Sequence, residues 1–93
     1  MEIKQENNEK GGRFVAYVDN KEAGIMTYTW PMEDKFIIDH TEVYDGFEGM
    51  GIGKKLVTQA VVYAREHNKK IIPVCPFAKS VIQKVVALQD VLA

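Results

Sequence analysis

A glycine-rich stretch is the part of the sequence whose composition most clearly suggests a binding site. Residues 49–55, GMGIGKK, lie between an apolar run and an amphipathic run. Glycines let the backbone turn tightly and bring successive N–H groups close to an anion. A helix N-terminus adds unpaired donors and a favourable dipole, which disfavours nearby lysines unless an anion is present. The stretch therefore predicts a phosphate-binding turn, with a glycine-rich connector carrying solvated lysines as the alternative.

Two well-known phosphate motifs do not fit this stretch. A Walker loop requires G-x-x-x-x-G-K-[ST], but Glu48 stands at the first glycine position and Lys55 at the hydroxyl position. A dinucleotide fingerprint requires G-x-G-x-x-G, and Lys54 or Leu56 stands where its third glycine belongs. The spacing therefore excludes both patterns and leaves a pyrophosphate-binding turn of another kind.

Two side chains near this turn could perform acyl-transfer chemistry. His40 precedes the turn on a strand-like run, and a neutral imidazole can remove a proton near neutral pH. Cys75 precedes Pro76 as the expected N-cap of the last helix, a position that favours the thiolate. The alternatives are a structural histidine and a cysteine that packs as a small apolar residue. Glu42 lies two residues from His40 on the same strand face and is the second candidate base.

The elements that must position these residues follow from the hydrophobic pattern. Apolar residues at Ile52, Leu56, Ala60 and Ala64 predict a helix over 51–67. Turn signals predict four antiparallel strands before it, the first ahead of residue 9 and the others at 13–18, 22–30 and 35–44. A fifth strand at 71–75 and a helix from 76 to 86 complete the order. The fourth and fifth strands are expected to be parallel, joined by a right-handed crossover.

Length and composition limit the range of functions. The 93 residues form one expected domain, 1–93, with 46% hydrophobic and 27% charged residues. A net charge of −1 argues against a nucleic-acid partner. One cysteine and two histidines match no metal site. The single cysteine, which cannot form an intramolecular disulfide, fits a reducing compartment. No apolar run suits a membrane span, so we expect a cytoplasmic protein. We also expect a monomer or a weak homodimer.

The order of elements and the motifs resemble the GNAT acetyltransferase superfamily. "IDHTEV", "GMGIGKKLV", "NKKIIPVCPFAKS" and the late "QDV" more narrowly resemble a family of very small GNAT-like proteins. The resemblance covers residues 36–91. It implies a single-domain α+β fold with a mixed, V-shaped sheet. It also implies that acetyl-CoA lies between the splayed fourth and fifth strands and that an acetyl group is transferred to an amine.

The same resemblance implies which residues form the site. His40 and Cys75 match a histidine and a cysteine of the small family, which makes them the candidate catalytic residues. The resemblance also places a main-chain N–H near Val43 at the thioester carbonyl oxygen. From their position in the first turn of the last helix, Lys79 and Ser80 could bond the cofactor, with solvated helix residues as the alternative. The complete set of expected cofactor contacts is Glu42, Val43, Gly49, Met50, Gly51, Ile52, Gly53, Lys54, Lys55, Phe77, Lys79 and Ser80.

Three features depart from the superfamily pattern. Glu48 occupies a position that usually carries glutamine or arginine. The helices that close over the acceptor in larger relatives have no room in this chain. No tyrosine lies in the last helix to protonate the leaving thiolate. The sequence predicts an acetyl-CoA-dependent N-acetyltransferase of unknown acceptor, with a non-catalytic CoA-binding sensor or interaction module as the alternative.

Overall fold

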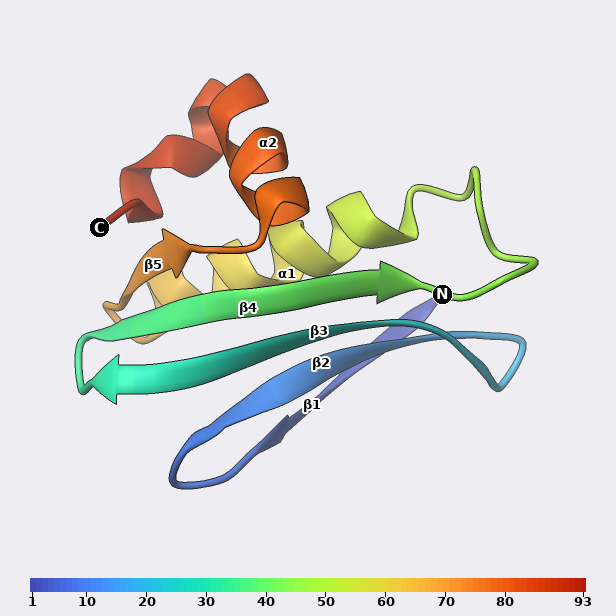
Figure 1. Cartoon of the computed structure of the whole chain (residues 1–93), viewed down its shortest axis with the longest axis horizontal. Coiled ribbons are helices and arrows are strands. Elements are labelled where there is room, and N and C mark those ends of the chain that lie inside the picture. Colours follow the sequence, from blue (N-terminus) through green and yellow to red (C-terminus); the bar gives the residue numbers. More distant parts are fainter.

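Five strands form one sheet in sequence order in the computed structural model, which covers residues 1–93 (Figure 1). Strands β1 to β4 pair antiparallel, and β5 pairs parallel to β4. The strands are β1 (Glu2–Asn7), β2 (Gly11–Val18), β3 (Lys21–Met32), β4 (Lys35–Val43) and β5 (Lys70–Pro73). The helices are α1 (Ile52–Glu66), α2 (Pro76–Lys84) and the 3₁₀ helix η1 (Val86–Val91). The predicted mixed α+β fold is therefore confirmed.

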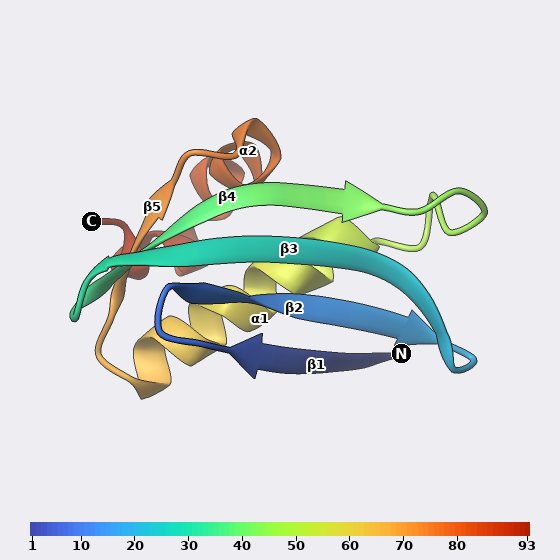
Figure 2. The same cartoon turned by 60° about the horizontal axis from the view of Figure 1, so that its bottom comes forward.

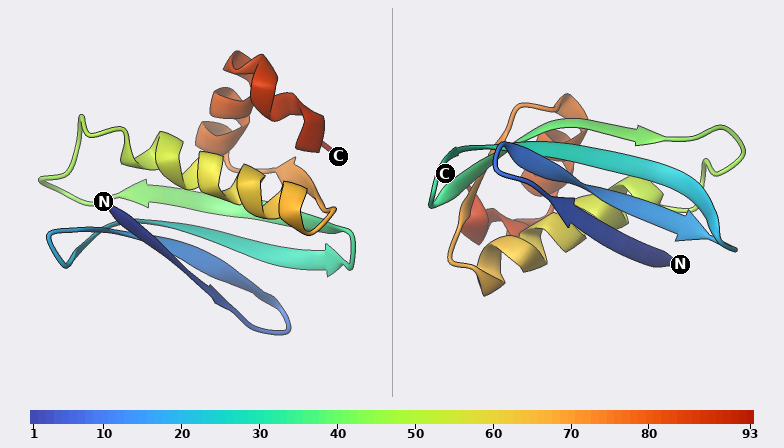
Figure 3. Two further views of the ribbon diagram at one scale, coloured as in Figure 1. Left: turned by 180° about the vertical axis from the view of Figure 1, so that it is seen from behind. Right: turned by 90° about the horizontal axis from the view of Figure 1, so that it is seen from below.

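Both α-helices pack on the same face of the sheet. In Figure 2, which is turned by 60° from Figure 1, β1 to β4 lie in front and α1 and α2 lie behind them. From behind, α1 crosses the sheet diagonally and α2 stands next to β5 (Figure 3). The chain thus has a helix-covered face and a helix-free face. None of its helices combines the length and apolarity needed to cross a membrane.

The helix-covered face holds the core. The predicted stripe of α1 is completely buried, as are Val57 and Val61 beside it. The isoleucine, leucine and valine side chains among them each contribute about 1.5–3 kcal/mol when fully buried. The stripe packs against a cluster that includes Phe14, Met26, Phe36, Ile38 and Ile82. This packing fixes the direction of α1 and therefore the position of the glycine turn that opens it.

Several element boundaries differ from those predicted. Strand β3 continues through Pro31, because the register with β4 is interrupted between Thr29 and Met32 and Pro31 has no ladder partner there. Helix α2 ends at Lys84, since the extended backbone of Val85 (ψ 99°) breaks it and starts η1. The hydrophobic pattern continues across this break, so the sequence predicted one helix in place of two.

The C-terminal segment covers the outer edge of β5. Leu92 forms a parallel bridge with Ile71, and Ala93 N–H donates to the Ile71 carbonyl (3.0 Å). Arg65 of α1 holds η1 through both carboxylate oxygens of Asp90, at 2.6 and 3.0 Å. The late "QDV" motif thus has a structural role: its Asp90 anchors the segment whose next residues, Leu92 and Ala93, cover the edge of β5.

Candidate active site

Strands β4 and β5 separate after only four pairs. The last pair is Ile38 with Pro73, and the N–H groups of Val74 and Cys75 then both donate to the Ile38 carbonyl, at 3.2 and 3.0 Å. Beyond this point β4 continues to Val43, whereas the chain after β5 turns away into α2 (Figure 1). The pairing of the two strands therefore ends at Ile38, as the V-shaped sheet predicted, and we call the place where their backbones diverge the gap.

A bulge in β4 begins at the same point. Ile38 pairs with Tyr28 and His40 pairs with the adjacent Thr27, so Asp39 is an extra residue without a partner. A bulge reverses the side-chain alternation that follows it. Thr41 consequently shares the helix-covered face with its partner, the buried Met26, while His40 points to the helix-free face.

His40 is paired with Glu42 on the helix-free face. The His40 Nε2 atom lies 3.3 Å from the Glu42 Oε1 atom, and the two side chains are 62% and 54% exposed. A carboxylate at this position can orient the imidazole and hold its tautomer. The pair is open to solvent and therefore accessible to an acceptor.

Cys75 lies on the other side of the gap, at the N-cap of α2. It is only 5% exposed, and its Sγ atom lies 3.5 Å from the Thr41 Oγ1 atom. Burial raises the pKa of the thiol, but the N–H of Ala78, the Thr41 hydroxyl and the N–H of Phe77 outweigh it, so the net pKa is lowered. The fold thus stabilises the thiolate of Cys75.

His40 and Cys75 do not contact each other. The partner of His40 is Glu42 and that of Cys75 is Thr41, on opposite faces of the sheet. Both residues nevertheless border the gap that begins at Ile38. The expectation that they serve one reaction remains a prediction, and any joint action requires a substrate that passes through the gap.

The glycine turn presents a row of free backbone donors. Gly49 and Gly51 have φ values of 79° and 72°, and a Cβ atom at either position would meet nothing within 4 Å. The first hydrogen bond of α1 runs from Lys55 N–H to the Gly51 carbonyl (3.0 Å). None of the N–H groups of residues 48–54 donates a hydrogen bond within the chain. The turn therefore offers an accessible nest of donors, the form of site that holds a pyrophosphate.

The side chain of Glu48 is occupied within the preceding turn. Its carboxylate accepts hydrogen bonds from the N–H of Gly46, at 2.9 and 3.3 Å. The carboxylate therefore stabilises the turn at Gly46. This contact gives a structural role to the residue that departs from the superfamily pattern.

The lysines of the turn border a depression on α1. Lys54 and Lys55 are exposed, and with Gly51, Thr58, Gln59 and Ile3 they line a hollow of about 510 Å³. Two cations beside the free N–H groups supply the charge that a pyrophosphate needs. Met50 is also exposed at the tip of the turn.

The glycine turn and the start of α2 meet through Gly53 and Phe77. A Cβ atom at Gly53 would lie 2.6 and 2.8 Å from the Cζ and Cε2 atoms of the Phe77 ring. Gly53 is buried, whereas Phe77 remains 43% exposed beside the gap. The missing side chain therefore lets α2 approach α1, which brings the Cys75 end of α2 close to the turn.

The remaining predicted residues surround these features. Ile52 is buried in the core, and Val43 is partly buried against it. Lys79 is exposed and Ser80 is half-buried in the first turns of α2. Sequence reasoning missed Thr41, the partner of Cys75; the one signal for it was its place in the "HTEV" motif.

Comparisons with known proteins agree with this geometry. The family model for GCN5-related N-acetyl-transferases matches residues 13–91. The chain belongs to the GCN5-related N-acetyltransferase family. It is therefore an acetyl-CoA-dependent N-acetyltransferase, and the match does not specify its acceptor. No match was found among curated protein sequences.

Solved structures share the fold of this acetyltransferase. A GCN5-like protein from Staphylococcus aureus, solved by NMR, is 40% identical over 99% of this chain and 87% of its own, with a TM-score of 0.76. A ribosomal-protein-alanine N-acetyltransferase from Brucella melitensis is 19% identical over 84% of this chain and 62% of its own (TM-score 0.70). A GNAT family acetyltransferase from Elizabethkingia anophelis with bound acetyl-CoA is 16% identical over 81% of this chain and 52% of its own (TM-score 0.65).

Proposed function

We propose that the protein transfers the acetyl group of acetyl-CoA to an amine in two steps, through Cys75 on the helix-covered side of the gap and His40 on the open side. The observation that carries this proposal is the position of these two residues on opposite sides of one gap, each with its own hydrogen-bonding partner. Acetyl-CoA supplies the activated acyl group as its thioester.

The glycine turn is the proposed site for the CoA pyrophosphate. The free N–H groups of residues 48–54, the open space over Gly49 and Gly51, and the exposed Lys54 and Lys55 support this assignment. Because Phe77 packs on Gly53 next to this turn, the proposed route from the pyrophosphate to the gap runs past the Phe77 ring. Lys79 and Ser80 are placed to bond the cofactor from α2.

Cys75 is the proposed acyl acceptor of the first step. Its thiolate attacks the acetyl carbonyl carbon, a new thioester bond to Sγ forms, and the bond to the CoA sulfur breaks with that sulfur leaving as a thiolate. One thiolate replaces another, so this step needs no proton donor. This balance accounts for an active site without a tyrosine in the last helix.

His40 is the proposed base of the second step. Its neutral imidazole takes a proton from the acceptor amine, whose nitrogen attacks the carbonyl carbon held on Cys75. The amide bond forms and Cys75 leaves as a thiolate, which the N–H groups of Ala78 and Phe77 stabilise. Glu42 orients the imidazole and stabilises the imidazolium that results. Because Cys75 must stay reduced, the proposed location is the cytoplasm.

Release of CoA thiol, measured with acetyl-CoA over a panel of amines, tests these roles. We expect turnover in the wild type, loss of turnover in Cys75→Ser and a fall of about 10²- to 10⁴-fold in His40→Gln. His67→Gln is the matched control, because His67 stacks on Tyr63 at the other end of α1 (4.2 Å between ring centres) and should behave as wild type. Turnover in Cys75→Ser at the wild-type rate would contradict the two-step route.

A further inference from the structure

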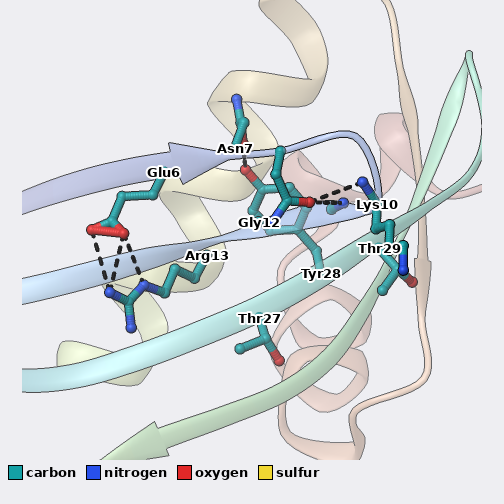
Figure 4. Close-up of a pocket in the computed structure, with 10 residues that line it drawn as sticks. Glu6, Asn7, Lys10, Gly12, Arg13, Thr27, Tyr28 and Thr29 are labelled. Carbon is teal, nitrogen blue, oxygen red and sulfur yellow. Dashed lines mark hydrogen bonds and ion pairs between the residues drawn. The ribbon is translucent and has the colours of Figure 1, made fainter.

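The helix-free face carries a second feature, a hollow next to His40 that the proposed chemistry does not use. It measures about 410 Å³, and only one of its 10 lining residues is hydrophobic. The hollow lies where β1, β2 and β3 meet, beside the turn that joins β1 to β2 (Figure 4). Gly11, which lies opposite Thr29 on this face, is one of the lining residues.

A continuous row of side chains connects this hollow with His40. The strand register places His40 opposite Thr27, Thr27 opposite Arg13, and Arg13 opposite Glu6, all on the helix-free face. Thr27 and Arg13 line the hollow directly. Two strand spacings, about 10 Å in total, therefore separate the base from Arg13.

The charges at the two ends of this row are opposite in sign. At the His40 end, Glu42 is an exposed carboxylate whose one side-chain partner is the imidazole of His40. At the hollow, Lys10 makes no ion pair and Arg13 is paired with Glu6, its Nε and Nη2 atoms at 3.1 and 3.0 Å from Oε2. The hydroxyls of Thr27 and Thr29 form no side-chain hydrogen bonds within the chain, although both residues line the hollow (Figure 4).

We infer that this face is the acceptor site, and that it takes a small amine carrying an anionic group about 10 Å from its nitrogen, such as a short peptide with a free carboxylate. The amine lies at His40 and Glu42, and the anionic group lies at Lys10 and Arg13. A tripeptide spans about 10 Å when extended, which matches the row. The inference rests on the proposed acetyl transfer.

Triglycine and triglycinamide form a matched pair of probes, because they differ only in the charge of the far end. We expect KM to be about tenfold lower for triglycine, the effect of one charge-assisted hydrogen bond. Diglycine, whose carboxylate cannot reach the hollow, should gain less over its own amide. Equal KM values for triglycine and triglycinamide would overturn the inference while leaving acetyl transfer intact, whereas no transfer to any amine would overturn both.

Variants of the hollow give effects of opposite sign. In Arg13→Gln the preference for triglycine over its amide should fall toward one. In Glu6→Gln the preference should rise, since Arg13 is released from its partner. Lys21→Gln removes a lysine at the β2–β3 turn, outside the hollow, and should leave the preference unchanged. An equal loss with both probes in Arg13→Gln, or no rise in Glu6→Gln, would overturn the inference.

Discussion

Replacing Gly51 with alanine changes the residue on which the start of α1 depends. Gly51 is the N-cap of α1 and has a left-handed backbone, with φ at 72° and ψ at 21°. No side chain caps the helix there. A Cβ atom at this position would meet nothing within 4 Å, so alanine introduces backbone strain without a steric clash. The substitution therefore isolates the conformational requirement of the turn.

The expected loss of stability follows from two terms. Holding a non-glycine residue in the left-handed region costs about 1–2 kcal/mol. Alanine also reduces the entropy of the unfolded chain, which returns about 0.4–1 kcal/mol. The net destabilisation is about 1 kcal/mol, and for a domain of this size it lowers Tm by about 4–8 °C. Asparagine tolerates the left-handed region, so Gly51→Asn should lose less.

Thermal unfolding followed by circular dichroism, with and without CoA, measures both the strain and its effect on binding. Because the free N–H groups point correctly only in the left-handed turn, Gly51→Ala should also gain less stabilisation from CoA than the wild type, with Gly51→Asn between them. If Gly51→Ala matches the wild type in Tm and in its CoA-dependent shift, the turn does not need this conformation and the reasoning fails.

Three further predictions concern other contacts. Asp90→Asn should destabilise the chain at neutral pH, because the partner arginine Arg65 lowers the pKa of the Asp90 carboxyl. The difference in unfolding free energy from wild type should vanish as pH falls below the ordinary carboxyl pKa of 3.8. Urea unfolding at several pH values measures this trend. Alkylation of Cys75 by iodoacetamide should reach half its maximal rate below pH 9.0, because the thiol pKa is lowered. Thr41→Val should move that midpoint upward. An unchanged midpoint would exclude the Thr41 hydroxyl as a cause of the lowered pKa. Gly53→Ala should cost about 1 kcal/mol through the Phe77 ring, and a double-mutant cycle with Phe77→Leu should recover most of it.

Much of the fold could be predicted from local pattern. The four-residue spacing of apolar residues predicted helix α1, and turn residues marked the ends of the strands. Both signals arise from neighbours along the chain, so they can be read from the sequence. The end of α2 at Lys84 was not predictable in this way, since the apolar pattern continues into η1. The extension of β3 through Pro31 also depends on an interrupted register with β4 that only tertiary structure shows.

The candidate site was only partly predictable, for the same reason. The glycine spacing indicated the turn, but the bulge at Asp39 has no sequence signal, and it decides that His40 and Thr41 face opposite sides of the sheet. The sequence therefore indicated the histidine and the cysteine as the catalytic residues without showing that they lie on different faces of the sheet. Glu48 is another example, since its bond to Gly46 N–H is a contact within a turn that spacing alone does not reveal.

Intact-mass spectrometry of the His40→Gln variant, incubated with acetyl-CoA in the absence of any amine, tests the two-step transfer most directly. Removing the base slows the second step only, so the account predicts one acetyl group per chain, located on Cys75 by peptide mapping and lost slowly when an amine is added. Cys75→Ser in the same background is the control and should remain unmodified. An unmodified Cys75 in a preparation that still releases CoA thiol with an amine would contradict the account.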